Sequence, residues 1–338
     1  MNKLGVAIIG CGSIHRVHAD AVVNSELGHM VCVVDIQDDR AQASAQDYHC
    51  QWHTDFNEVI KDDAVDVVHI CTPHYLHTEM AVKALMAGKH VLVEKPVVRH
   101  IDEIKQVIKA REESGRCIGV CFQNRFNTTS QKAKEIIDSG TVGAVKGIKG
   151  IVTWYRDEDY YTASGWRGKF ATEGGGVLIN QSIHTIDLIQ WLAGGVEAVK
   201  GGVSTQLLGK VIEVEDTAHA TLFFRNGARG VFFATNCYTS NSPVEIEIDC
   251  EKARIRLYQG KLFIEQNGNV SCIADDNGGE TIYKSYWGKS HAVLIENFYR
   301  GILNGDPGCI ISAEEAVESV RIIDGIYKSA STGNLIHI

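Results

Sequence analysis

The stretch VAIIGCGSIHRVHAD, residues 6–20, places two glycines between a short apolar run and a segment with helical spacing. The run VAII predicts a buried β-strand, and a helix is expected over residues 14–27. In a dinucleotide-binding turn the first glycine, here Gly10, permits a sharp bend, and the second, Gly12, lets the backbone approach a pyrophosphate at the helix N-terminus. His15 stands where the motif has its third glycine. The turn predicts a nucleotide-binding domain with altered helix–strand packing.

The chain continues this alternation of strand and helix up to residue 122. Strands are predicted at 30–35, 65–71, 90–94 and 117–122, and helices at 38–47, 76–87 and 101–114. The strands are continuous apolar runs, which is typical of a parallel sheet covered by helices on both faces. We therefore expect an α/β fold whose first domain, residues 1–122, is a Rossmann-type parallel sheet.

The pattern changes after a helix expected at about 128–139. Apolar and polar residues then alternate, for example in AHATLFF (218–224), and short Asn-Gly turns separate several segments. Such alternation predicts an open-faced, mainly antiparallel sheet with one covered face. Together with closing helices at about 289–304 and 313–330, it indicates an α+β domain over residues 123–338 for substrate binding and oligomerisation.

The stretch GGGVLINQSIHTIDLIQWLAGG, Gly174–Gly195, has the spacing of a single amphipathic helix flanked by glycines. Its apolar face contains Ile179, Ile183 and Ile186, and the neighbouring polar strip contains Asn180, His184 and Asp187. From this pattern alone His184 is either a core histidine bonded to Asp187 or a proton-transferring group.

Charged and polar side chains follow the predicted strands. Asp35 ends the second strand, where the dinucleotide motif has an acidic residue that binds the ribose hydroxyls. Its negative charge disfavours a 2′-phosphate, so we expect NAD rather than NADP. Thr72-Pro73 and Glu94-Lys95-Pro96 follow later strands, at the edge where open α/β sheets bind ligands.

Composition excludes several classes of protein. The net charge of −9 argues against a nucleic-acid or anionic-membrane partner, and no apolar run reaches the roughly 18 residues of a membrane span. The ten cysteines are scattered, without a Cys-x-x-Cys pair, which indicates reduced thiols in a cytoplasmic protein and no metal site. No G-x-S-x-G hydrolase motif occurs.

Three segments together closely resemble the Gfo/Idh/MocA family of NAD(P)-dependent oxidoreductases, which act mostly on sugars and cyclitols. They are GCGSIHRVHAD, CTPHYLHTEMAVKALMAGKHVLVEKP and EGGGVLINQSIHTIDLIQWLAG, in this order, and the likeness covers essentially the whole chain. It implies that Lys95 is the catalytic lysine beside the nicotinamide and that a cis bond precedes Pro96. It also implies a homodimer or homotetramer formed through the open sheet.

The cofactor-binding residues expected from the resemblance and from the strand ends form one set. They are Gly10, Gly12, Ser13, Ile14, Asp35, Thr72, Pro73, His77, Glu94, Lys95 and Gln123. For the chemistry, we expect His184 to remove the hydroxyl proton, because imidazole titrates near neutrality, and Lys95 to stabilise the alkoxide oxygen. The site is expected in a cleft between the two domains.

Asn180 is a departure from the family, which usually has Asp-x-x-x-His on this segment. An asparagine does not accept a proton at ordinary pH, so we expect Asn180 to position the imidazole ring or a substrate hydroxyl. Candidate substrate-binding residues are Arg125 and, in the loop 154–170, Tyr155, Trp166 and Arg167. The sequence of this loop fits two interpretations equally well. Its aromatic side chains either stack on a sugar ring or pack within an ordinary surface loop.

The favoured function is an NAD-dependent dehydrogenase of a secondary ring hydroxyl in a sugar, inositol or related polyol. An NAD-dependent glycosidase that works by transient oxidation and elimination would use the same residues. A non-catalytic NAD-binding sensor is a third alternative, which the presence of both Lys95 and His184 disfavours.

Overall fold

A computed structural model describes residues 3–277 and 290–338. The chain divides into two compact units. The first comprises the described residues of Met1–Gln123 and Thr281–Val317, and the second those of Asn124–Glu280 and Glu318–Ile338. The chain first passes between the units next to the predicted boundary at residue 122. It then returns to the first unit, so neither unit is one continuous segment.

The first unit is built on a six-stranded parallel sheet with the order β3-β2-β1-β4-β5-β6. This is the expected Rossmann-type sheet, and its strand order reverses between β1 and β4, where such sheets bind ligands. The strands are β1 (Leu4–Ile9), β2 (Gly28–Val34), β3 (Gln51–His53), β4 (Val67–Ile70), β5 (His90–Val93) and β6 (Ile118–Val120). All residues of β1 and β4 are buried, as the continuous apolar runs predict.

One helix of the first unit was expected in the second domain, residues 123–338. α9 (His291–Asn304) packs against α1, and Ser25 donates a hydrogen bond to Glu296 over 2.6 Å. The helix was expected to begin near residue 289, which lies outside the described residues. The other helices are α1 (His15–Val23), α2 (Asp38–Tyr48), α3 (Phe56–Lys61), α4 (His74–Met86), η1 (Ile101–Glu103) and α5 (Ile104–Ser114), and the short η4 (Pro307–Cys309) follows α9.

The second unit contains a nine-stranded sheet with the order β14-β13-β12-β11-β7-β10-β9-β8-β15. Every neighbouring pair is antiparallel except β7 and β10, which are parallel, so the sheet is mainly antiparallel as expected. The strands are β7 (Val145–Thr153), β8 (Val196–Ser204), β9 (Thr217–Phe224), β10 (Arg229–Thr235), β11 (Glu245–Cys250), β12 (Arg254–Tyr258), β13 (Lys261–Gln266), β14 (Asn269–Asp275) and β15 (Ile336–His337).

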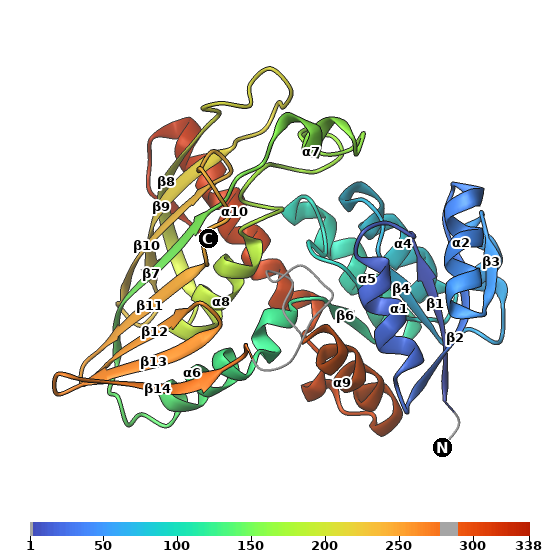
Figure 1. The fold of residues 1–338 in the computed structure, drawn as a ribbon, viewed down its shortest axis with the longest axis horizontal. Helices are drawn as coiled ribbons and strands as arrows, with labels where there is room; N and C mark the ends of the chain where they lie inside the picture. The colour runs from blue at the N-terminus through green and yellow to red at the C-terminus, as the bar shows by residue number, and fades with distance from the viewer. Residues whose placement is uncertain (1–2, 278–289) are drawn as a thin grey trace. The chain divides into compact units, whose positions relative to one another are not determined.

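Helices cover one face of this sheet. α6 (Thr128–Asp138) packs on β12 to β14 and α8 (Ile183–Ala193) on β7 and β11, and Figure 1 shows both helices on the same side of the sheet. Gly150 in β7 makes the approach of α8 possible, because a Cβ there would clash with the side chain of Ile189. The opposite face is open: in β10, Phe232 is 3% exposed and its neighbour Phe233 is 38% exposed.

The remaining helices are α7 (Glu158–Thr162), η2 (Gln123–Phe126) and the long α10 (Ala313–Thr332). Among the described residues, no helix combines the length and apolar character needed to cross a membrane. The nine cysteines whose side chains the structure describes are free thiols.

Candidate active site

The turn after β1 has the backbone that its glycines predict. Gly10 has φ of +96°, and a Cβ there would lie 2.8 Å from the carbonyl oxygen of Cys71 at the end of β4. A Cβ at Gly12, by contrast, would meet no atom within 4 Å among the described residues. The backbone at Gly12, followed by exposed Ser13 and by Ile14 at the N-cap of α1, is therefore open to a ligand. This opening at a helix N-terminus fits a pyrophosphate.

His15 shows what replaces the third glycine of the motif. Its side chain is buried, and its Nδ1 lies 2.7 Å from the carbonyl oxygen of Gly12 and its Nε2 3.0 Å from the hydroxyl of Ser44 in α2. Burial lowers the pKa of His15, so the ring is neutral and donates from Nδ1 to Gly12 while Ser44 donates to Nε2. The imidazole thus ties the glycine turn to α2 and leaves the ligand-facing side unobstructed.

Asp35 is held directly beside this turn. One carboxylate oxygen accepts a hydrogen bond from the backbone N–H of Cys11 over 2.8 Å, and the other accepts from Gln37 over 2.9 Å. The carboxylate is half-buried at the end of β2. Its fixed position next to the glycine turn fits the ribose-binding role predicted from the sequence.

Two loops at the ends of β4 and β5 are joined through His77. Its Nε2 lies 2.9 Å from the carbonyl oxygen of Thr72, and its Nδ1 lies 2.7 Å from that of Pro96. The peptide bond between Lys95 and Pro96 is cis, as the family resemblance implied. His77 is 1% exposed and burial lowers its pKa, so the neutral ring donates its one N–H to one of these carbonyl oxygens and contacts the other. The ring thus lies between the two loops, the second of which carries half-buried Lys95.

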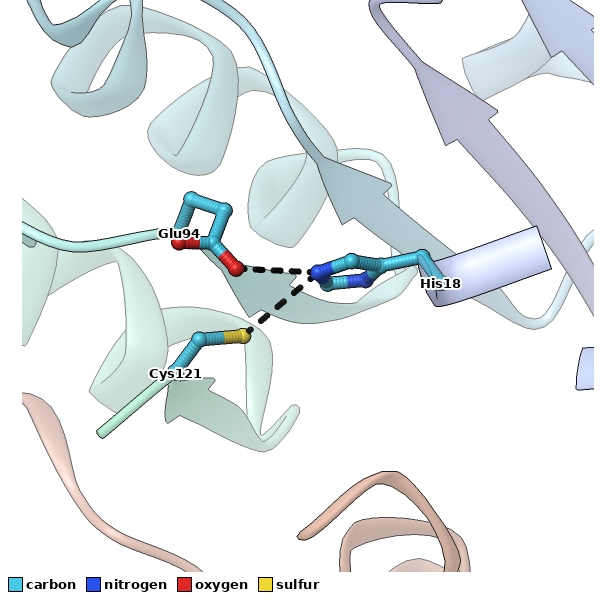
Figure 2. A group of neighbouring side chains, drawn as sticks. All are labelled: His18, Glu94 and Cys121. Atoms are coloured by element: carbon cyan, nitrogen blue, oxygen red, sulfur yellow. Dashed lines mark hydrogen bonds and ion pairs between the residues drawn. The ribbon is translucent and has the colours of Figure 1, made fainter. Parts of the chain in front are cut away.

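Glu94 begins a chain of buried side chains that the sequence analysis did not predict. Its carboxylate lies 2.9 Å from Nε2 of His18, whose Nδ1 lies 3.0 Å from Nδ1 of His69, and Nε2 of His69 lies 2.9 Å from the hydroxyl of Tyr299 (Figure 2 shows the Glu94 end). Burial alone would raise the pKa of Glu94, but hydrogen bonds from His18 and His291 more than offset it and hold the pKa well below its usual value. Glu94 is therefore an ionised carboxylate.

The glycine-led segment of the second unit differs from the prediction. α8 begins only at Ile183, and residues 173–182 form turns, so the expectation of one continuous helix was wrong. The backbone N–H groups of Gly176 and Leu178 donate instead to the carboxylate of Glu215, over 3.0 and 2.9 Å. Because Glu215 occupies these donors, Asn180 lies on the turn and not one helical step before His184.

Glu173, immediately before the glycines, contacts Asn180. Its carboxylate accepts hydrogen bonds from the side-chain amide of Asn180 and, over 2.5 Å, from the backbone N–H of Gly168. The side chain is fully buried, and this burial raises the pKa of Glu173 to about 7. Since both contacts need an acceptor, the NH₂ group of Asn180 faces Glu173 and its oxygen faces away.

Arg125 and Asp187 form a buried ion pair in the second unit. The guanidinium donates to both carboxylate oxygens, over 2.8 and 2.7 Å, and the two residues are 4% and 1% exposed. Both oxygens of Asp187 are therefore engaged by Arg125. This geometry favours a role for Arg125 in fixing α8 over the direct substrate contact that the sequence suggested, and neighbouring Gln123 is likewise buried.

The loop before the glycine turn contains stacked aromatic and arginine side chains. The guanidinium of Arg167 lies 4.4 Å from the ring centre of Tyr160 and 5.0 Å from that of Trp166. Arg156 approaches the same Tyr160 ring at 5.1 Å, and Tyr155 is 50% exposed. Arg167 and Trp166 thus pack against other side chains of the loop, while Tyr155 presents an aromatic surface to solvent.

The residues that the sequence missed share one property. Glu173, Glu215, His18 and His69 are all buried polar groups, and the hydrogen-bond partners of the last three lie far along the chain. A sequence signal existed only for Glu173, which directly precedes three glycines, and for His18, which lies one turn after His15 on α1.

Comparison with known proteins identifies the family. Residues 4–122 match the family model described as "Oxidoreductase family, NAD-binding Rossmann fold", and residues 130–256 match the "GFO/IDH/MocA C-terminal domain". The scyllo-inositol 2-dehydrogenase (NAD(+)) of Bacillus subtilis (strain 168) is 33% identical over 90% of this chain and 87% of its own length. The D-glucoside 3-dehydrogenase of Escherichia coli (strain K12) is 27% identical over 100% and 98% of the two chains.

A solved structure shows the same fold. The WlbA dehydrogenase from Bordetella pertussis, in complex with NADH and UDP-GlcNAcA, matches with a TM-score of 0.86 and 29% identity, covering 100% of this chain and 99% of its own. The glycine turn, Asp35 and the Glu94-Lys95-Pro96 loop occur in the unit that matches the NAD-binding model. The chain therefore belongs to the Gfo/Idh/MocA family of oxidoreductases, and its first unit is an NAD-binding Rossmann domain.

Proposed function

We propose that this protein is an NAD-dependent dehydrogenase that oxidises or reduces a secondary ring hydroxyl or ketone of an inositol, a sugar or a related polyol. The observation with most weight is the 33% identity to an NAD⁺-dependent inositol dehydrogenase over 90% of the chain. The glucoside dehydrogenase relative is also named for oxidation of a hydroxylated ring. Lys95 and His184, the two residues that the resemblance makes essential, are both present.

The first unit would hold the cofactor. Gly10 and Gly12 leave room for the pyrophosphate at the N-terminus of α1, and Asp35 accepts hydrogen bonds from the ribose hydroxyls. When bound, NAD accepts or returns the hydride. Lys95 stabilises the negative charge that develops on the reacting oxygen, and His77 keeps its loop in place.

The second unit would supply the proton acceptor. His184 lies at the start of α8 and is half-exposed, so its ring can exchange a proton with a substrate hydroxyl. Glu173 fixes the amide of Asn180 with its oxygen turned outward, where it accepts a hydrogen bond from the imidazole or from the substrate. The carboxylate that the family usually has at position 180 is thereby replaced by a Glu173–Asn180 pair.

Tyr155, Trp166 and Arg167 are proposed to bind the substrate. An exposed aromatic ring suits the apolar face of a sugar or cyclitol, and guanidinium groups donate to hydroxyl oxygens. We further propose a cytoplasmic enzyme, consistent with its free cysteines, that assembles as a homodimer or homotetramer through the open face of the nine-stranded sheet.

A fluorescence screen for NADH tests the proposal. Purified protein is incubated with NAD⁺ and a panel of inositols, aldoses, anhydrosugars and aryl glycosides. Stoichiometric NADH from a free polyol supports the dehydrogenase. Cleavage of an aryl glycoside without net NADH identifies the glycosidase alternative, and NAD binding without turnover of any compound identifies the sensor.

A further inference from the structure

Three side chains of different chemistry meet in the interior of the first unit. His18 comes from α1, Glu94 follows β5 and Cys121 follows β6, and all three are buried. Their donor atoms lie within 4.8 Å of one another. Figure 2 shows the Glu94 carboxylate and the Cys121 thiol both directed at Nε2 of His18, at 2.9 and 4.0 Å. The nitrogen, oxygen and sulfur atoms are therefore close enough to share one ligand.

One polar atom beside this cluster has no hydrogen-bond partner among the described residues. A single proton on Nε2 of His18 is directed to Glu94, so the thiol of Cys121 faces a nitrogen that is already engaged. Nε2 of His291 lies 3.7 Å from the same Glu94 oxygen, and its buried Nδ1 has no hydrogen-bond partner among the described residues. Four potential ligands thus converge, and the Glu94 carboxylate interacts with the other three at once.

The surroundings of His18 match those of a metal-binding histidine, whose second nitrogen is usually held by a hydrogen bond. Nδ1 of His18 lies 3.0 Å from Nδ1 of His69, and Nε2 of His69 lies 2.9 Å from the hydroxyl of Tyr299. With a metal on Nε2, His18 donates from Nδ1 to His69, and His69 donates from Nε2 to the Tyr299 oxygen. Each ring keeps one proton, so the network accepts a metal without a buried imidazolium.

We propose that His18, Glu94 and Cys121 bind one zinc ion, with His291 or a water molecule at the fourth position. A nitrogen, oxygen and sulfur donor set is typical of Zn²⁺, whereas Mg²⁺ and Ca²⁺ prefer oxygen ligands alone. On binding, the Cys121 thiol releases its proton to solvent and no group changes oxidation state. Glu94, whose side chain is 10% exposed, provides the point of entry. The separation of the three ligands along the chain hides the site from motif searches.

The expected consequence is reversible inhibition, a part of the proposal that rests on the proposed role of Lys95. Lys95 directly follows Glu94. Because Glu94 and Lys95 share one short loop, a zinc ion held by the Glu94 carboxylate changes the placement of Lys95 relative to the substrate oxygen.

Cobalt spectroscopy tests the site without any assay of activity. Co²⁺ is titrated into the metal-stripped full-length chain with a phosphine reductant, because thiol reductants chelate metals. We expect one Co²⁺ per chain, visible tetrahedral bands, a thiolate-to-cobalt charge-transfer band, and displacement by one equivalent of Zn²⁺. Cys121→Ala should abolish the charge-transfer band, and His18→Asn should abolish the tetrahedral bands. Cys250→Ser, a change in the second unit, should preserve both kinds of band.

Several results would overturn the site. They are an octahedral cobalt spectrum, a charge-transfer band that persists in Cys121→Ala, or a band that disappears in Cys71→Ser instead. Circular dichroism checks that each variant is folded. Cys121→Ser, which preserves the size of the side chain but removes the thiolate, replaces Cys121→Ala if that variant does not fold.

Zinc titration of turnover tests the inhibition separately. With a substrate from the NADH screen, we expect activity to fall at least about 10-fold at saturating zinc and to return with a chelator. For each variant, turnover with zinc is compared with turnover of the same variant without zinc. Cobalt binding without zinc inhibition would disprove the effect on Lys95 and leave the site intact. Absence of turnover with every polyol would refute the proposed function, and the cobalt spectrum would still decide the metal site.

Discussion

At the scale of single residues, Glu173 gives the glycine turn a pH-dependent group. Its carboxylate is fully buried and has a pKa of about 7, raised first by burial and lowered in part by hydrogen bonds from Asn180 and Gly168. Near neutral pH the group is therefore partly protonated. A neutral Glu173 can donate as well as accept, which loosens the constraint on the Asn180 amide.

We expect the burial of Glu173 to make stability depend on pH. Its pKa is raised from 4.5 to about 7, so between these values the folded protein binds a proton that the unfolded chain has released. The stabilisation is fully present below pH 4.5 and is lost as the pH rises through 7, by roughly 3 kcal/mol. The measurement is the difference in free energy of unfolding between wild type and Glu173→Gln from pH 4 to 8. A difference that stays constant, as expected for exposed Glu158→Gln, would contradict the assignment.

His184 carries the clearest catalytic prediction. Removing the proton acceptor with His184→Asn should lower kcat on the order of 10²-fold or more, because general base catalysis contributes at least that much. The change keeps a polar side chain of similar size at the start of α8. His337→Asn, an exposed histidine of the same unit, is the matched control and should leave kcat unchanged. Near-normal turnover in His184→Asn would remove His184 from the mechanism.

Asp35 determines the expected cofactor preference. Two backbone N–H groups fix its carboxylate beside the glycine turn, where a 2′-phosphate would meet a negative charge. We expect kcat/KM for NAD to exceed that for NADP by at least about 10-fold, or about 1.4 kcal/mol. Asp35→Asn should narrow this ratio, and exposed Asp38→Asn should not. Comparable kcat/KM values for the two cofactors in the wild type would contradict the prediction.

At the scale of elements, α8 is attached to its surroundings in two ways. Gly150 in β7 allows the helix to lie close to the sheet, with the side chain of Ile189 in the space that a Cβ would fill. The buried ion pair between Arg125 of η2 and Asp187 fixes the helix from another side, and Ser319 of α10 also donates to Asp187 over 3.3 Å. The start of α8, and His184 with it, is therefore positioned by contacts distant in sequence.

We expect Arg125→Met to destabilise the protein by about 3 kcal/mol or more, because it leaves the Asp187 carboxylate buried without a partner. Chemical denaturation measures the loss. Lys132→Met, which breaks the exposed Lys132–Glu135 pair of α6, should cost less than about 1 kcal/mol. The double variant Arg125→Met with Asp187→Leu should recover much of the loss. If Arg125→Met and Lys132→Met lowered the free energy of unfolding equally, burial of the Arg125–Asp187 pair would not determine its contribution to stability.

At the scale of the whole molecule, one face of the nine-stranded sheet remains exposed. Helices cover the other face, and Val231 and Phe233 on β10 are 56% and 38% exposed. Light scattering should give a mass of two or four chains. Phe233→Glu should shift it towards the monomer, and Leu207→Glu, an exposed change in a loop, should not. A monomeric wild type would refute association through this face.

The sequence by itself determined the elements that depend on local patterns. The glycine turn, the continuous apolar strands of the first sheet and the alternating strands of the second follow from steric freedom at glycine and from side-chain periodicity. Asp35, Lys95 and His184 could be singled out because each follows or begins such an element, and the family resemblance came from these same segments.

Only the tertiary structure decided which polar groups are buried together. The start of α8 shifted to Ile183 because Glu215, distant in sequence, takes the backbone donors of the turn. Glu173 has a raised pKa because the fold removes it from water, and His18, Glu94 and Cys121 converge because three separate elements bring them together. Desolvation and contact between distant segments are properties of the folded chain, and local sequence patterns do not encode them.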